Sequence, residues 1–236
     1  PLMNPKGNRE KMIELMFETF NVPSFFAVNQ SVLSLYSTGC MTGIAVESGG
    51  SNTEIVPVYE GYYMPHASVN LSLAGNDLTK WLKKILIEHK CTCEKELNQM
   101  GVVNDIKEKC SYVAFDYDEE LKKAKLSSEC NTSYTFSNGE VITITDEQFC
   151  CPELLFKPQL NGFQFNGIDK CLFDSINKCN VDIQKDLYEN IVISGGSTMF
   201  KGFKERFEKE ILNNKPPTMN VRIVAQPEPN YAAWIG

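Results

Sequence analysis

Residues 42–61 constrain the fold of this chain most, because they have the pattern of a β-hairpin. β-Branched and apolar residues stand on both sides of a tip formed by Gly49, Gly50, Ser51 and Asn52. A Gly-Gly pair is a strong turn signal, since glycine accepts a positive φ without steric cost. Such a tip can also direct several backbone N–H groups at one point, which suits an anion such as a phosphate. The same residues would also form an ordinary hairpin with a glycine turn.

Two carboxylates flank this tip. Glu47 precedes it and Glu54 follows it. A carboxylate near a phosphate is useful mainly when a divalent cation lies between them. The hairpin is therefore either a plain structural turn or one wall of a phosphate and metal site.

The first third of the chain is predicted to run from helix to strand to helix and then to three consecutive strands. The expected helices are 8–20 and 31–37, and the expected strands are 25–28, the two arms of the hairpin, and 62–73. Asn8 is a suitable cap for the first helix, and Gln30 opens the second. The strand at 25–28 is expected to be buried, and alternating side chains favour the strand at 62–73.

The middle of the chain is predicted to be mostly helical. Apolar residues recur at helical spacing in 77–90, and a second helix is expected at 95–110. A short strand at 112–115, a charged helix or loop at 116–129 and a hairpin at 134–145 complete this part.

The last third is predicted to alternate helices with strands. The expected helices are 145–156, 168–178, 183–188 and 201–213, and the expected strands are 190–194 and 221–224. The turn from Gly195 to Thr198 joins a strand to a helix, as in units that bind phosphate or ribose. A tight structural turn would use the same residues.

Composition argues against several classes of function. The 236-residue chain has a net charge of −7, and its basic residues are scattered, so nucleic acid and anionic membranes are not expected partners. Its longest apolar runs are too short to span a bilayer. Nine cysteines are dispersed, and the close pairs Cys91/Cys93 and Cys150/Cys151 lack the spacing of a zinc site. We expect reduced thiols of an intracellular protein.

Several motifs spread over the chain resemble the actin family. They are N-P-K-x-N-R-E-K-M at 4–12, F-E-T-F-N at 17–21, Q-x-V-L-S-L-Y at 30–36, P-V-Y-E-G at 57–61, D-I-K-E-K at 105–109, S-G-G-x-T-M at 194–199 and W-I-G at 234–236. The resemblance implies an α/β fold, an actin-like ATPase lobe of the ribonuclease H-like type. Such a lobe has a mixed sheet flanked by helices and an inserted, mostly helical subdomain.

The resemblance also implies a division of the chain. Residues 1–38 would be a start segment that bridges from another lobe, 39–73 and 151–236 the core subdomain, and 74–150 the inserted helical subdomain. Actins have two lobes around a nucleotide cleft, and this chain resembles the second, so we expect it to be a fragment.

A site for ATP or ADP with Mg²⁺ is implied as well. Gln30 matches the glutamine that orients the attacking water, a role that suits a neutral amide. Glu54 stands at the position of a histidine that helps to activate this water, and a carboxylate can act as a base. Glu47 matches an aspartate that holds Mg²⁺ through water. The nucleotide is expected to contact Gly49, Gly50, Ser51, Asn52, Gly75, Lys107, Glu108, Gly195, Gly196, Ser197, Met199 and Phe200.

The chain departs from the family pattern within this implied site. Glu47 is one methylene longer than aspartate, Gly50 replaces an acidic residue, and Phe200 lacks the usual hydroxyl. Asn104 and Asn230 replace basic residues, which weakens the attraction for a polyanion. Because a metal displaced by about an angstrom matters in phosphoryl transfer, we expect impaired hydrolysis, with weak nucleotide binding by this chain.

Two further features concern partners. Tyr36 and Tyr62 match aromatic residues of the actin groove that takes regulator helices, although two ring edges in a core would give the same pattern. In the loop 157–163, Leu160 matches an apolar tip that reaches neighbouring protomers, with Asn161 in place of a second apolar residue. The implied partners are actin or actin-like subunits and actin-regulatory proteins.

We therefore expect a divergent actin-like protein of the cytoskeleton or of an actin-related complex. It would bind ATP in its full-length form, hydrolyse it slowly if at all, and act mainly through protein contacts. The alternatives are a conventional filament-forming actin with ATP hydrolysis and, more remotely, a small-molecule kinase of the same superfamily. The expected location is the cytoplasm, with the nucleus as the alternative.

Overall fold

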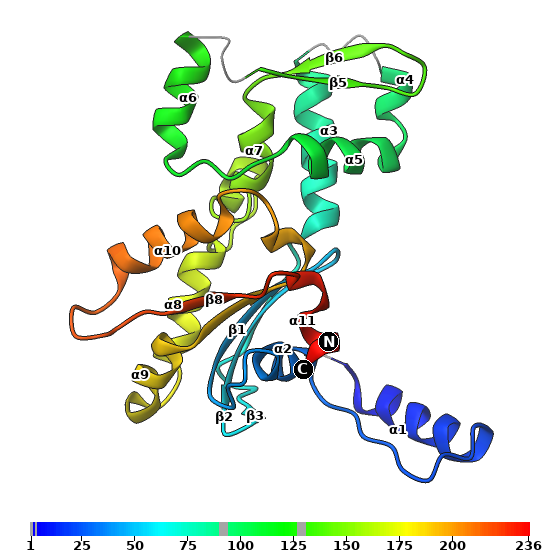
Figure 1. Cartoon of the computed structure of the whole chain (residues 1–236), viewed down its shortest axis with the longest axis vertical. Coiled ribbons are helices and arrows are strands. Elements are labelled where there is room, and N and C mark those ends of the chain that lie inside the picture. The colour runs from blue at the N-terminus through cyan, green and yellow to red at the C-terminus, as the bar shows by residue number, and fades with distance from the viewer. Residues whose placement is uncertain (1, 3, 90–93, 127–130) are drawn as a thin grey trace.

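A mixed six-stranded sheet forms the centre of the computed structural model, which describes residues 2, 4–89, 94–126 and 131–236 (Figure 1). The strand order is β3-β2-β1-β7-β8, and β4 pairs with the far end of β2. The strands are β1 Gly43–Ser48, β2 Thr53–Tyr59, β3 Tyr62–Tyr63, β4 Val69–Leu71, β7 Ile191–Ser194 and β8 Ile223–Ala225. β1 is antiparallel to β2 and parallel to β7, and β7 is parallel to β8.

Helices bury both faces of this sheet. The whole of β1 is buried, as expected for a parallel strand covered on two sides. Helix α2 (Gln30–Tyr36) packs on one face, where Leu35 joins Val56 and Val192 in a small apolar cluster. Helices α8 (Ile168–Asn177), α9 (Val181–Glu189) and α10 (Phe203–Asn214) belong to the main core, which includes Ile44 and Ile193 of the sheet.

A mostly helical layer lies beyond one end of the sheet, at the top of Figure 1. It consists of α3 Gly75–Glu88, α4 Glu94–Leu97, α5 Met100–Cys110, α6 Tyr117–Leu126, the hairpin of β5 Thr132–Thr135 and β6 Val141–Ile144, and α7 Glu147–Glu153. Helix α3 packs against both α5 and α7, and the indole of Trp81 donates to the carbonyl of Cys150 across the second contact. Arg206 of α10 reaches back to Glu153 of α7 and joins this layer to the core.

The remaining helical segments are short or lie near the chain ends. They are α1 Lys6–Glu14, a π-helical turn η1 Leu15–Thr19, the 3₁₀ turns η2 Pro158–Asn161, η3 Gly196–Thr198 and η4 Pro229–Tyr231, and α11 Ala232–Ile235. Helix α11 packs on α2, whereas α1 projects from the body (Figure 1). No residue of α1 is buried.

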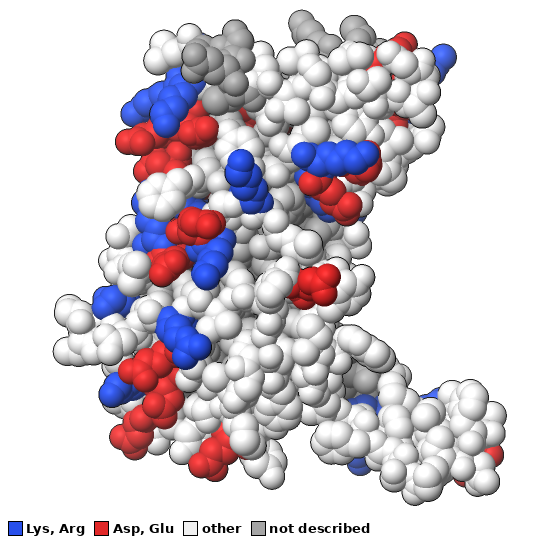
Figure 2. Space-filling view, viewed as in Figure 1, with Lys and Arg blue, Asp and Glu red and all other residues white. Residues whose placement is uncertain are grey.

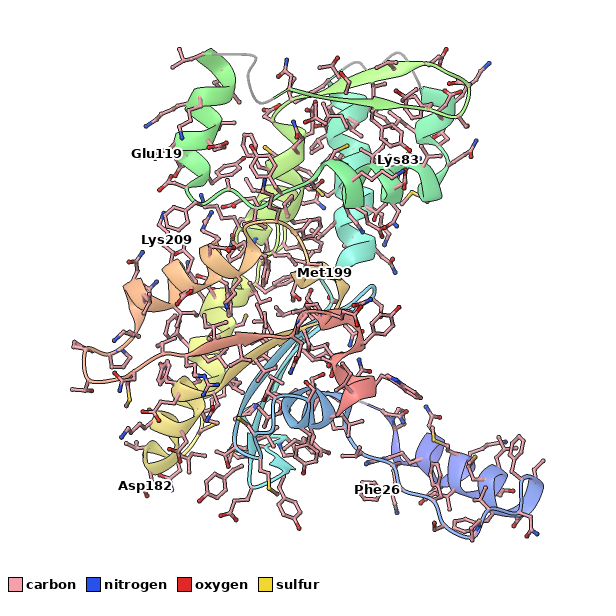
Figure 3. The ribbon with its side chains drawn as sticks, viewed as in Figure 1. Phe26, Lys83, Glu119, Asp182, Met199 and Lys209 are labelled. Atoms are coloured by element: carbon pink, nitrogen blue, oxygen red, sulfur yellow. The ribbon has the colours of Figure 1, made fainter. Side chains whose placement is uncertain are left out.

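Most expected elements are confirmed, but the strand at 25–28 is wrong. These residues form no ladder, and Phe26 is 84% exposed on the projecting arm (Figure 3). Its run of apolar residues has the composition of a strand, but a strand needs a neighbour to pair with. The cap assigned to Asn8 is also wrong, since helix α1 begins at Lys6, after Pro5.

Three other expected elements differ in the structure, two of them because they are divided into shorter pieces. The strand at 62–73 is two short strands, β3 and β4, separated by a turn around Pro65. The helix at 95–110 is split into α4 and α5. The expected strand at 112–115 makes only an isolated bridge between Tyr112 and Lys201. The charged segment 116–129 contains the solvent-facing helix α6.

Acidic and basic side chains alternate along one edge of the face seen in Figure 2. Among the residues that the structure describes, no helix combines the length and the apolar character needed to cross a bilayer.

Candidate functional site

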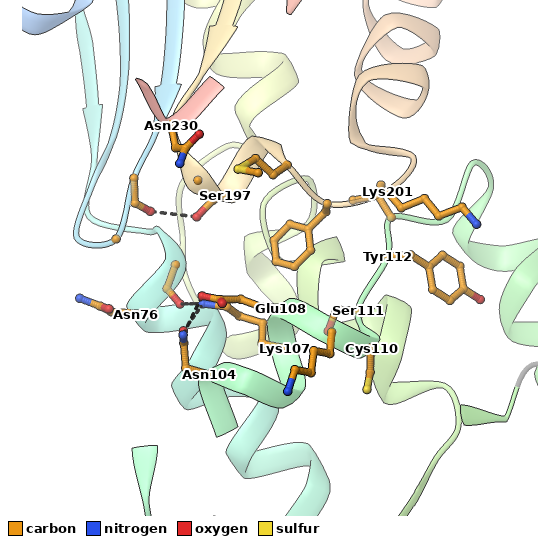
Figure 4. A pocket seen from close by; sticks show the side chains of 18 of the residues that line it. Asn76, Asn104, Lys107, Glu108, Cys110, Ser111, Tyr112, Ser197, Lys201 and Asn230 are labelled. Atoms are coloured by element: carbon orange, nitrogen blue, oxygen red, sulfur yellow. Dashed lines mark hydrogen bonds between the residues drawn. The ribbon is translucent and has the colours of Figure 1, made fainter. Parts of the chain in front are cut away.

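A cavity of about 1030 Å³ lies where the sheet meets the helical layer (Figure 4). It is lined by Gly49, Gly50, Gly75, Asn76, Asn104, Lys107, Glu108, Lys109, Cys110, Ser111, Tyr112, Val113, Gly196, Ser197, Met199, Phe200, Lys201, Gly202 and Asn230. Most residues expected to contact a nucleotide are thus brought to one hollow from four separate parts of the chain. Its size falls at the upper end of the range of small-molecule sites.

Hydrogen bonds join the hairpin tip to two of the other parts, the start of α3 and the turn η3. The carbonyl of Gly49 accepts from the backbone N–H of Gly75 at 3.0 Å and from the Ser197 hydroxyl at 2.8 Å. The N–H of Asn76 donates to the carbonyl of Gly50 at 2.7 Å. The tip, the start of α3 and the turn η3 are therefore fixed relative to one another. Neither Gly49 nor Gly50 has a positive φ, so the expected reason for these glycines is wrong.

Gly195 supports the site from behind. Its φ of 90° and ψ of 154° belong to a region that only glycine enters readily. A Cβ atom there would lie 2.3 Å from the carbonyl oxygen of Ser48. Gly195 itself does not line the cavity, and its role is to let β7 turn sharply against β1 and present Gly196 and Ser197.

Lys107 is a buried cation at the wall of the cavity. Its Nζ atom donates to the carbonyl of Gly75 at 3.0 Å, to the hydroxyl of Thr79 at 2.9 Å and to the amide oxygen of Asn104 at 2.8 Å. Burial lowers the pKa of Lys107, against the opposing influence of Cys151 and Glu108. The amide of Asn104 also donates to Glu108, so these side chains form one network (Figure 4).

Glu47 and Glu54 face each other across the hairpin. They are direct partners in the β1–β2 register, and both are nearly buried, with 9% and 5% exposed. Gln30 donates from its amide to Glu47, and Asn52 donates to Glu54 at 2.9 Å. Burial raises the pKa of Glu47, and the charge of Glu54 raises it further against the hydrogen bond from Gln30. Like charges placed opposite each other destabilise a hairpin.

This pair fits a hard divalent cation. Mg²⁺ prefers carboxylate oxygens and retained water, and two buried carboxylates that repel each other gain from a cation between them. Glu47 and Glu54, together with the amide of Gln30, are the residues that would hold it. Ser31 adds a hydroxyl 3.5 Å from Glu47.

Replacing Glu54 with glutamine is expected to raise the free energy of unfolding at pH 7 by about 0.2–1 kcal/mol, because it removes a like-charge pair. The folded pKa of Glu47 is raised above 4.5, so the folded state binds this proton more tightly than the unfolded state. The repulsion between Glu47 and Glu54 therefore destabilises the folded state more as the pH rises from 4.5 through the folded pKa of Glu47. The stability gained by Glu54→Gln should shrink at acidic pH. Denaturant unfolding at several pH values measures this.

The matched control is Glu18→Gln, which removes an exposed carboxylate of the projecting arm. It should leave stability unchanged at all pH values. Added Mg²⁺ should stabilise the unmodified chain more than Glu54→Gln. Equal stabilisation of both chains would contradict the cation role of Glu54.

A family model for actin matches residues 1–236. The chain belongs to the actin family. The match extends over the sheet, the helical layer and every part of the cavity.

In this actin-family chain, not all of the expected site residues meet in the cavity. Ser51, Asn52 and Gly195 do not line it, nor do Gln30, Glu47 and Glu54, which lie behind the tip. The Ser51 hydroxyl bonds to Asn52, and Asn52 in turn to Glu54, so the far side of the tip is occupied by its own contacts.

The two residues expected to line a partner groove, Tyr36 and Tyr62, lie at the opposite end of the sheet from the hairpin tip. Tyr62 is 81% exposed on the short edge strand β3. The Tyr36 hydroxyl lies directly against Gly61, the residue before Tyr62. The Tyr36 ring is half-buried there. Tyr62 is accessible to a partner, whereas Tyr36 also packs on the apolar cluster of α2.

Sequence reasoning missed part of the cavity wall. The missed residues are Asn76, Lys109, Cys110, Ser111, Tyr112, Val113, Lys201 and Gly202. They form three runs that begin directly after Gly75, Glu108 and Phe200, so continuing the expected segments would have found them.

The thiols agree with the expectation of reduced cysteines where the structure describes them. Cys150 is half-buried and Cys151 buried, and burial raises their pKa values to about 11 and about 12. Such thiols stay protonated near neutral pH and react slowly. Cys91 and Cys93 lie outside the described residues.

Proposed function

We propose that this chain forms the nucleotide-binding wall of a divergent actin-family protein, which binds ATP with Mg²⁺ and acts mainly through protein contacts. The observation that carries the proposal is the cavity in which the glycine tip, the turn at Ser197 and the network of Lys107 and Glu108 converge. Backbone N–H groups of glycine-rich turns suit phosphates, and the helix that carries Lys107 offers polar groups to a nucleoside.

Slow hydrolysis follows from the arrangement behind the tip. Gln30 donates to Glu47, so a carboxylate sets the orientation of the amide expected to position water. Glu54 adds a second negative charge directly across the hairpin from Glu47. When bound, Mg²⁺ supplies charge neutralisation for phosphate oxygens, and these two carboxylates and the amide would hold it. Repulsion and misplacement both oppose fast phosphoryl transfer.

A conventional filament-forming ATPase is the second candidate. The loop 157–163 is relevant to filament formation, because it carries the apolar residue Leu160. Leu160 lines a small cavity together with Trp81 and Ile85 of its own chain. Asn161 stands next to Leu160 and is half-buried. Burying an amide without a partner in each filament contact costs about 1–3 kcal/mol, which favours short or mixed assemblies over long filaments. Actin-like subunits and actin regulators are the proposed partners, in a cytoskeletal or nuclear complex.

Replacing Asn230 with lysine is expected to tighten the binding of Mg-ATP to this chain by about fivefold, or about 1 kcal/mol. Asn230 is exposed and lines the cavity, so a cation there attracts the phosphates at little structural cost. Titration calorimetry of both chains at low salt, repeated at high salt, measures the difference. The unmodified chain should bind Mg-ATP with a dissociation constant above the micromolar range.

The matched control is Asn213→Lys, an exposed position near the end of α10 that adds the same charge away from the cavity. It should bind like the unmodified chain. If both lysines tighten binding equally, or if neither chain binds Mg-ATP at millimolar concentration, the nucleotide assignment is wrong. Phosphate release as fast as that of a conventional actin would favour the second candidate instead.

A further inference from the structure

The end of α3 and the start of α7 bring a histidine and two carboxylates together. The Nδ1 atom of His89 lies 2.6 Å from Oε1 of Glu147 and 3.9 Å from Oδ1 of Asp146. One potential ligand atom from each of the three lies within 4.8 Å of the other two. His89 and Glu147 are 58 residues apart, so no spacing in the sequence reveals this cluster.

A small cavity of about 100 Å³ opens beside the cluster. Besides His89, Asp146 and Glu147, it is lined by Trp81, Ile85, Tyr117, Cys150 and Leu160. Liquid water occupies about 30 Å³ per molecule, so this space can hold an ion with a few water ligands. None of these lining residues is a lysine or an arginine, so His89 is the only basic side chain in this wall to offset the carboxylates.

Thr145 fixes both carboxylates in place. Its backbone N–H donates to Oε2 of Glu147 at 2.6 Å. Its hydroxyl lies 2.9 Å from the same oxygen and 3.0 Å from Oδ1 of Asp146. Outer contacts of this kind orient the ligands of metal sites. They leave Oε1 of Glu147 directed at His89.

Burial opposes the charge of Glu147, but hydrogen bonds from Thr145, from its own backbone N–H and from His89 outweigh burial and lower its pKa. The His89 side chain is 52% exposed, which gives an ion a path from solvent.

We propose that His89, Asp146 and Glu147 bind a divalent transition-metal ion of the zinc class, with water completing the coordination. One imidazole nitrogen and two carboxylate oxygens are a donor set that suits Zn²⁺. In a tetrahedral zinc site, neighbouring ligand atoms lie about 3.3 Å apart, so each of the two distances from Nδ1 of His89 has to change by less than an angstrom. The ion takes the place of the proton between His89 and Glu147. It would link the two helices that hold the helical layer together.

Titration calorimetry with Zn²⁺ on the reduced chain tests the site. We expect one equivalent bound at these residues, and a loss of affinity of roughly tenfold or more in His89→Gln and in Asp146→Asn. Acidification should also weaken Zn²⁺ binding, because protons compete with the metal for its ligand atoms. Zn²⁺ should raise the melting temperature of the unmodified chain but not that of His89→Gln.

The control variant is His66→Gln, which removes the other, exposed histidine and should bind Zn²⁺ like the unmodified chain. Cysteines elsewhere can also take up zinc, so the experiment is repeated with Co²⁺. A nitrogen and oxygen site gives only weak d–d bands, which His89→Gln should remove. An intense thiolate charge-transfer band as the sole signal, or equal Zn²⁺ affinity in all three variants, would overturn the proposal. In that case the cluster is only a hydrogen-bonded ion pair.

Discussion

Replacing Arg206 with methionine is expected to lower the free energy of unfolding by about 3–5 kcal/mol. The guanidinium donates to both oxygens of Glu153 at 3.2 Å and to the carbonyl of Ala114 at 2.9 Å. Glu153 is fully buried, so the variant leaves a carboxylate whose nearest remaining cation is Lys157, at 3.5 Å. Denaturant unfolding measures the loss.

The direction of the pH dependence follows from Glu153. Burial already raises its pKa despite the attraction of Arg206 and Lys157. Without Arg206, this carboxylate gains more by binding a proton, so the loss of stability should shrink as the pH falls. The double variant Arg206→Met with Glu153→Met removes both charges and should recover most of the loss, since apolar replacement of a buried pair is often neutral. A double variant as unstable as the single one would show that packing, not charge, is responsible.

Replacing Gly195 with alanine is expected to cost about 2–6 kcal/mol, the combined cost of a backbone conformation that alanine avoids and of a clash in a packed region. The clash is severe because the new Cβ atom would meet the Ser48 carbonyl of β1 at 2.3 Å. Both β1 and the turn would have to move, so the tip and Ser197 should separate. Thermal unfolding gives the cost in stability.

The adjacent glycine provides the matched control. A Cβ atom at Gly196 meets no atom within 4 Å, and its φ is not positive. Gly196→Ala should therefore keep stability close to that of the unmodified chain, although it lines the cavity. If both alanines were tolerated equally, the strained turn would not be the reason for a glycine at 195.

The sequence predicts those parts of the molecule that local chemistry decides. The hairpin at 42–61 is confirmed, because its β-branched arms and short polar tip agree with each other. Once the hairpin and the position of its tip are known, the register of the two strands places Glu47 directly opposite Glu54. The glycine turn after β7 is confirmed for a similar reason, since only a glycine can occupy the conformation of Gly195.

The parts that sequence misses depend on distant segments. Residues 25–28 have the composition of a strand but no strand to pair with, and their exposure could not be read from their own pattern. The network around Lys107 needs α3 and α5 to pack side by side. The cluster of His89 with Glu147 joins two helix ends that nothing in the local sequence relates.

The parallel pairing of β1 with β7 has a consequence for how the chain folds. β1 and β2 can form as soon as their hairpin is synthesised, but β7 follows only after the whole helical layer. Until then, one edge of β1 lies open and apolar, and such an edge can pair with other chains. Contacts between segments so far apart in sequence also slow the folding reaction. The sheet is therefore completed late, when β7 pairs with β1. β7 is also the strand that leads into the cavity wall.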